Sequence, residues 1–159
     1  MTRQRSGTFG RILTGLLYAT AVLLPVCLAF LSRDGDYGAP LTEAGRGAAL
    51  VGLALVALQP VLAARLSWIE RPWSLNLLYV FHKTIGMTVA VLLALHPVLL
   101  ASGKNRMSLL LEIDQPWFIL LGKGTLTLLL IMVLTSSLSG HLPLRYEGWR
   151  RLHNALFLL

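Results

Sequence analysis

The sequence predicts an all-α protein, a polytopic bundle of membrane-spanning helices. Apolar residues make up 55% of its 159 residues, and the mean hydropathy is +0.69, which is typical of polytopic membrane proteins and not of soluble domains. Four apolar runs are candidates for spans, since a bilayer requires about 20 helical residues. We therefore expect a single membrane domain over residues 1–159.

The predicted spans follow one another along the chain. The first covers residues 12–31, the second 48–66 and the third 78–101. Lys123 interrupts the fourth run, residues 116–138. Because a lysine at the centre of a span costs about 2.5 to 3.5 kcal/mol, we place the core of this span after the lysine and expect the lysine to extend to the outer interface.

A fifth apolar run, residues 152–159, is too short to cross a bilayer. We interpret it as the start of a fifth span, so the sequence is expected to stop inside an element. The first run is interpreted as a retained anchor and not a signal peptide. It is about twenty residues long, and no small-x-small cleavage site precedes Asp34.

The basic residues predict a cytoplasmic N-terminus. Arginines gather in the N-terminal tail, after the second span and before the fifth run: Arg3, Arg5, Arg11, Arg65, Arg71, Arg145, Arg150 and Arg151. The opposite loops carry both signs of charge, so the positive-inside rule places the arginines in the cytoplasm. Basic residues dispersed in short clusters beside apolar runs indicate membrane topology, and no nucleic-acid partner is expected. We expect a multi-pass protein of the cell membrane, in a bacterium the inner membrane.

Two histidines stand out within the third span. His82 and His96 are fourteen positions apart, which on a helix is about 21 Å along the axis and about 40° around it. One helix face therefore presents an imidazole near each side of the bilayer. Ionisable residues inside a membrane are expensive and usually functional, so the pair predicts two metal or haem sites in line.

A third histidine completes the inner site in this prediction. The third span and the fifth run both cross from inside to outside, so His82 and His153 lie at similar depth. Two facing imidazoles on rigid helices are what bis-histidine haem ligation requires. The partner of His96 would lie about fourteen residues beyond His153. The alternative is that these histidines only hydrogen-bond between helices.

Most of the other notable residues near these positions have two interpretations. Pro97 can kink the helix beside His96 or merely loosen the end of the span. Gly86 leaves room either for a flat ligand or for a closely packed helix. His141 lies in a turn-rich stretch and is expected to be solvated. Arg145, Arg150, Arg151 and Lys83 are candidates to pair with haem propionates, or they only anchor the topology.

No catalytic triad, pair of acids, Walker loop or zinc signature is present in the sequence. The Gly-x-Gly of residues 122–124 follows no predicted strand and is rejected as a dinucleotide fingerprint. Cys27 is the sole cysteine, so neither a disulfide framework nor a CxxC metal site is possible within the chain. Redox chemistry would therefore depend on a cofactor.

Several stretches together resemble the ferric reductase-like transmembrane domain. They are Phe-His-Lys-Thr-Ile-Gly at 81–86, Ala-Leu-His-Pro at 94–97, Thr-Ser-Ser at 135–137 and Tyr-Glu-Gly-Trp-Arg-Arg-Leu-His at 146–153. That superfamily includes ferric reductases, NADPH oxidases and the haem-binding membrane subunit of the methionine sulfoxide reductase system. The resemblance covers about residues 78–159.

The resemblance implies a six-helix bundle that holds two b-type haems between its third and fifth helices. His82 and His153 would then ligate the inner haem, and His96 one side of the outer haem. The fourth ligand and the family's FAD- and NAD(P)H-binding domain have no counterpart in these residues. The chain is therefore expected to be a fragment, or else unable to hold the outer haem in the usual way.

Three functions follow as hypotheses. The first is transmembrane electron transfer through haem b, as the membrane component of an oxidoreductase, from a cytoplasmic flavin and NAD(P)H module to ferric iron or oxygen outside. The second is a quinol-oxidising haem anchor for a periplasmic reductase partner. The third, of a different class, is a haem-free membrane scaffold or transport component.

Overall fold

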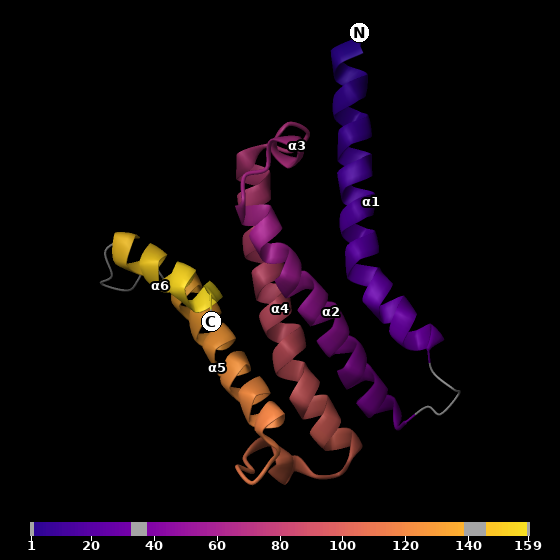
Figure 1. Cartoon of the computed structure of the whole chain (residues 1–159), viewed down its shortest axis with the longest axis vertical. Helices are drawn as coiled ribbons and strands as arrows, with labels where there is room; N and C mark the ends of the chain where they lie inside the picture. The colour runs from indigo at the N-terminus through magenta and orange to yellow at the C-terminus, as the bar shows by residue number, and fades with distance from the viewer. Residues whose placement is uncertain (1, 33–37, 139–145, 159) are drawn as a thin grey trace. The chain divides into compact units, whose positions relative to one another are not determined.

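The computed structural model describes residues 2–32, 38–138 and 146–158. The chain is 85% helical, and no strand occurs in those three ranges, which confirms the predicted all-α fold. The elements are α1 (Thr2–Leu31), α2 (Pro40–Ala63), α3 (Ser67–Glu70), α4 (Leu75–Gly103), the 3-10 helix η1 (Met107–Leu110), α5 (Trp117–Ser137) and α6 (Tyr146–Leu158) (Figure 1).

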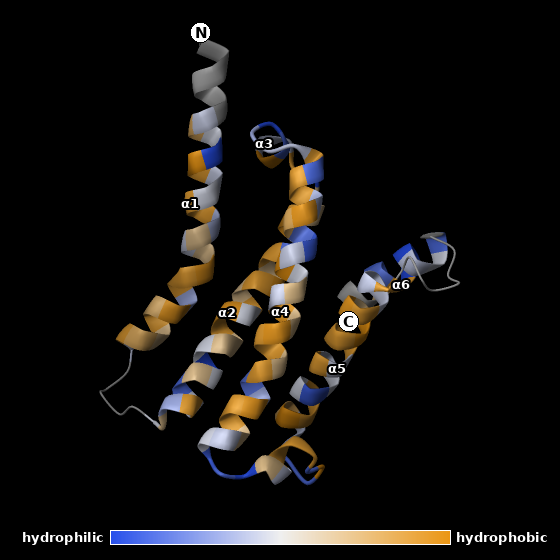
Figure 2. Ribbon diagram, turned by 180° about the vertical axis from the view of Figure 1, so that it is seen from behind, coloured by the Kyte–Doolittle hydropathy of each residue, from blue (hydrophilic) through white to orange (hydrophobic). Residues whose placement is uncertain are grey.

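Four of these helices are long and apolar enough to cross a membrane. The candidate spans are Thr8–Leu31, Pro40–Ala63, Leu75–Gly103 and Trp117–Ser137. Hydrophobic residues dominate all four, whereas α6 and the segment after α4 carry more hydrophilic residues (Figure 2). At most 17% of any span's most apolar window is buried inside the molecule, so the remaining apolar surface suits contact with lipid. The prediction of a multi-pass membrane protein is confirmed.

The second span differs from its predicted bounds. Helix α2 begins at Pro40 and ends at Ala63, whereas the hydropathy pattern predicted residues 48–66. Proline is favoured in the first helical turn, and Glu43 in that turn suits the positive end of the helix dipole. Past the C-terminus of the helix, Arg65 has a φ of 50°, a left-handed conformation that ends helical geometry.

The chain divides into two compact units, Met1–Met107 and Ser108–Leu159. In the first unit, α2 and α4 form the most extensive helix contact and run antiparallel side by side (Figure 1). Gly45 faces Leu99, and Gly52 faces Leu93. Small residues at such points let two helix backbones approach closely, and they set the register between α2 and α4.

Two side-chain hydrogen bonds join α1 to the segment that precedes α4. The Arg11 Nε donates to the Pro72 carbonyl over 2.7 Å, and the Trp73 Nε1 donates to the Thr14 hydroxyl over 2.7 Å. A small hydrophobic core lies beside these bonds; its buried members are Leu62, Ile69 and Leu78. The start of α4 is thereby joined to α1, α2 and α3.

The second unit contains α5 and α6, which contact each other. The Lys123 Nζ donates to the carbonyls of Leu109 (2.8 Å) and Glu112 (2.7 Å). The lysine side chain therefore extends from α5 to the segment before it, and its place at the outer interface stays a prediction. No residue of α5 is buried by the described parts of the chain.

Candidate functional site

Helix α4 carries two of the predicted site residues, His82 and His96. The helix is unbroken from Leu75 to Gly103, and the Ser74 side chain caps its start by accepting a bond from the backbone N–H of Leu77. Both imidazoles are half-buried. Pro97 does not end the helix, so both histidines lie on one continuous helix, as their spacing predicted.

His96 contacts α2. The His96 Nδ1 lies 2.8 Å from the carbonyl oxygen of Gly45. A carbonyl oxygen can only accept, so Nδ1 carries the hydrogen. This contact was not predicted, because Gly45 lies outside the expected second span and its pairing with α4 depends on the register of the two helices.

The residues next to His82 on α4 differ in what they contact. Phe81 makes an edge contact with Tyr18 of α1, with ring centroids 5.4 Å apart, and Lys83 is exposed. A Cβ placed on Gly86 would meet no described atom within 4 Å. Both uses predicted for Gly86, room for a flat ligand and close packing of a helix from the second unit, therefore stay predictions.

Helix α6 carries the third predicted ligand. The His153 imidazole is half-buried, and its ring centroid lies 5.4 Å from that of Trp149, with the planes inclined by 32°. Arg150 and Arg151 are exposed. Because α6 belongs to the second unit, the pairing of His153 with the histidines of α4 stays a prediction. His141 and Arg145 lie outside the described residues.

A cavity of about 370 Å³ lies where α1, α2 and α3 meet the start of α4. Its lining is mostly apolar and comprises Thr14, Gly15, Leu17, Tyr18, Ala21, Leu58, Val61, Leu62, Trp68, Ile69, Trp73, Leu77, Leu78 and Phe81. The Tyr18 hydroxyl is buried and makes no hydrogen bond within the described residues. Phe81, which directly precedes His82 in α4, contributes to the wall of this cavity.

Residues 48–159 match the family model described as "Ferric reductase like transmembrane component". The chain belongs to this family. Comparisons with curated proteins and with solved structures found no significant match. The family segment of this ferric reductase-like chain runs from α2 to α6 and includes His82, His96 and His153. Membership indicates a part in membrane electron transfer, in a family generally associated with haem and flavin.

One further polar residue of the ferric reductase-like segment lies beside α4. Both amide atoms of Gln59, Oε1 and Nε2, are buried and have no hydrogen-bond partner among the described residues. Along α2, Gln59 lies between the contact of Gly52 with Leu93 and the packing of Leu62 with Leu78. It is therefore beside the stretch of α4 that holds the first histidine. A glutamine within an apolar run was the signal available in the sequence.

These observations fit a haem in this ferric reductase-like chain. Leaving a buried amide without a partner costs about 1 to 3 kcal/mol, so Gln59 favours a polar partner. The described residues contain no group of three or more His, Cys, Asp or Glu side chains that could hold a metal ion. Single imidazoles suit the axial positions of haem iron, whereas a bare metal ion needs several protein ligands.

Proposed function

We propose that this chain is the membrane component of an electron-transfer system and that it carries electrons across the bilayer through b-type haem. The observation that carries the proposal is the family match over residues 48–159, which includes two half-buried histidines on one unbroken helix. Haem supplies reversible one-electron chemistry when bound. The chain's own residues hold it, orient it and tune its potential.

The ligands follow from this proposal. His82 and His153 hold the inner haem, and His96 holds one side of the outer haem, whose second ligand is expected about fourteen residues beyond His153. The exposed side chains of Lys83, Arg150 and Arg151 are candidates to pair with propionates. Residues 1–159 then act as one haem-binding domain.

The proposed direction is outward. The arginine clusters support a cytoplasmic N-terminus, and the donor is a flavin and NAD(P)H module on the cytoplasmic side. Ferric iron or oxygen accepts the electron outside the cell membrane, which in a bacterium is the inner membrane.

A second candidate function is supported by the cavity beside Phe81. An apolar space of about 370 Å³ lined in part by Tyr18, whose buried hydroxyl has no described partner, suits the ring of a quinol, which has an apolar body and polar oxygens. In this alternative the chain is the haem anchor of a periplasmic reductase partner. The two donors are distinguished by adding a soluble quinol or NADPH to membranes and following haem reduction.

The main test measures haem in the purified full-length protein. We expect reduced-minus-oxidised difference bands of b-type haem, and we expect His82→Ala to lose the inner haem while the outer haem remains. Tyr79→Ala, an exposed position on the same helix, is the matched control and should keep both. If the wild-type protein shows no b-type bands, the haem-free scaffold is correct; if His82→Ala retains all haem, the ligand assignment is wrong.

A further inference from the structure

The ring of His96 has a defined protonation pattern. Its Nδ1 lies 2.8 Å from the Gly45 carbonyl oxygen of α2, and that oxygen can only accept a hydrogen bond. The hydrogen of the neutral imidazole is therefore on Nδ1. The lone pair of the ring is on Nε2, which is the atom left to bind iron.

The contact depends on how closely α2 approaches α4 at Gly45. A Cβ at this position would lie 3.2 Å from the His96 carbonyl oxygen, 3.2 Å from the Leu99 Cβ and 3.3 Å from the Leu100 Cδ2. The His96 oxygen is a backbone atom and the Leu99 carbon is a Cβ, so neither can move aside unless the backbone of α4 moves. A side chain at 45 would push the helices apart by a few tenths of an ångström, and the hydrogen bond would lengthen.

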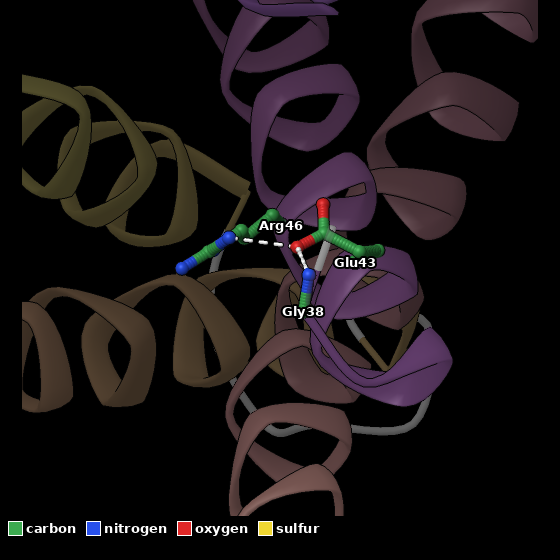
Figure 3. A network of polar contacts seen from close by, with 3 residues as sticks. All are labelled: Gly38, Glu43 and Arg46. Atoms are coloured by element: carbon green, nitrogen blue, oxygen red, sulfur yellow. Dashed lines mark hydrogen bonds and ion pairs between the residues drawn. The ribbon is translucent and has the colours of Figure 1, made fainter. Parts of the chain in front are cut away.

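The first turn of α2 is itself held in place. The Glu43 carboxylate accepts a bond from the Gly38 backbone N–H (3.3 Å) and pairs with Arg46 (2.7 Å) (Figure 3). The adjacent Thr42 is buried against Gly103 at the end of α4. The Gly45 carbonyl, which accepts the hydrogen bond from His96, therefore follows a helix start that is held in place by these contacts.

We propose that Gly45 is a positioning residue for the outer haem. Its carbonyl fixes the tautomer of the His96 ring and leaves Nε2 as the ring atom that would bind the iron. By accepting the Nδ1 hydrogen it also makes the imidazole more basic, which favours ferric over ferrous iron and lowers the midpoint potential. The inference rests on the proposed function, because it takes His96 as a haem ligand.

The experiment compares Gly45→Ala with Gly47→Ala in the full-length protein. Both changes replace a glycine of the same helix and gain the same helix propensity, but a Cβ on Gly47 would meet no described atom within 4 Å. Haem content and the two midpoint potentials are measured by redox titration. We expect Gly45→Ala to raise the outer potential and to weaken retention of the outer haem about 10- to 100-fold. The inner potential and all Gly47→Ala values should match wild type.

The outcomes separate the two proposals. A wild-type protein without a second haem overturns the function proposed for His96. Two haems in the wild type, with Gly45→Ala equal to Gly47→Ala, overturn the positioning role alone. An equal shift of both haems in Gly45→Ala also overturns it, because that result indicates a general loss of structure.

A second measurement remains decisive if Gly45→Ala does not fold. NMR of apoprotein carrying ¹⁵N-labelled histidine reports which ring nitrogen bears the hydrogen, and the His96 signals are identified by their loss in His96→Ala. A protonated Nδ1 and an unprotonated Nε2 support the proposal. The reverse tautomer overturns it.

Discussion

Both α2 and α5 contain glycines within an apolar span, and the surroundings of these glycines differ. In α2, Gly45 and Gly52 face leucine side chains of α4 at contact distance. In α5, a Cβ on Gly122 or Gly124 would meet no described atom within 4 Å. A glycine in a membrane helix therefore marks a packed interface only where a partner helix is in register with it, and the glycine alone does not reveal which case applies.

The same contrast applies to the polar side chains. His96 makes its hydrogen bond across the interface between α2 and α4, so its orientation depends on how two helices pack. Lys123 bonds to carbonyls of the segment just before its own helix, so its position depends on local chain geometry. Substitutions at the interface between α2 and α4 should therefore disturb the packing of two helices, whereas substitutions at Lys123 should disturb only the segment before α5.

The largest effect is expected from Gly103→Ala. A Cβ on Gly103 would lie 2.8 Å from the backbone nitrogen of Thr42, which is closer than Cβ atoms are found in proteins. Because backbone cannot move aside as a side chain can, the helix ends must separate, and we expect a loss of about 1 to 3 kcal/mol of stability. Unfolding of the purified protein in detergent, followed by circular dichroism, measures this loss.

Gly122→Ala is the matched control for that comparison. It adds the same methyl group to a glycine whose Cβ direction is open among the described residues, and alanine favours a helix over glycine by about 1 kcal/mol. Unchanged or slightly higher stability is expected. A loss equal to that of Gly103→Ala would mean that α5 is packed as tightly as α2.

A smaller and more local effect is expected from Lys123→Met. The change removes two charge-assisted hydrogen bonds and leaves the Leu109 and Glu112 carbonyls without this donor. Amides of residues 108–115 should exchange hydrogen faster, while those of α2 and α4 should not. Mass spectrometry of deuterium uptake measures both regions in one sample.

Lys104→Met serves as the control for this change because Lys104 is exposed and follows α4 directly. Its exchange rates should equal those of wild type. Faster exchange throughout the chain in Lys123→Met would contradict a local role for the lysine.

Much of the fold could be predicted from the sequence, and the reason is chemical. A bilayer imposes a minimum length of apolar helix, so the spans of α1, α4 and α5 were located by hydropathy alone. The start of α2 at Pro40 was missed because residues 40–47 are less apolar, although proline and an acidic first turn favour a helix start there. The short α3 and η1 have no apolar periodicity to reveal them.

The site was predictable only in part. The spacing of His82 and His96 is a property of one helix, so it could be computed from residue numbers. The bond from His96 to Gly45 and the burial of Gln59 depend on the register between two helices. That register follows from glycines meeting leucines across the interface, which no local pattern encodes.

The smallest effect is expected from Arg46→Gln, even though its ion pair with Glu43 is short, at 2.7 Å. The arginine side chain is 51% exposed, and exposed pairs contribute about 0.2 to 1 kcal/mol. Glu43 also keeps its bond from the Gly38 backbone, so the first turn of α2 retains its anchor. Unfolding in detergent should show a loss well below that of Gly103→Ala, and it should vanish at high salt because salt screens surface charges. A loss as large as that of Gly103→Ala would indicate that the start of α2 is held by charge rather than by close packing of its small residues.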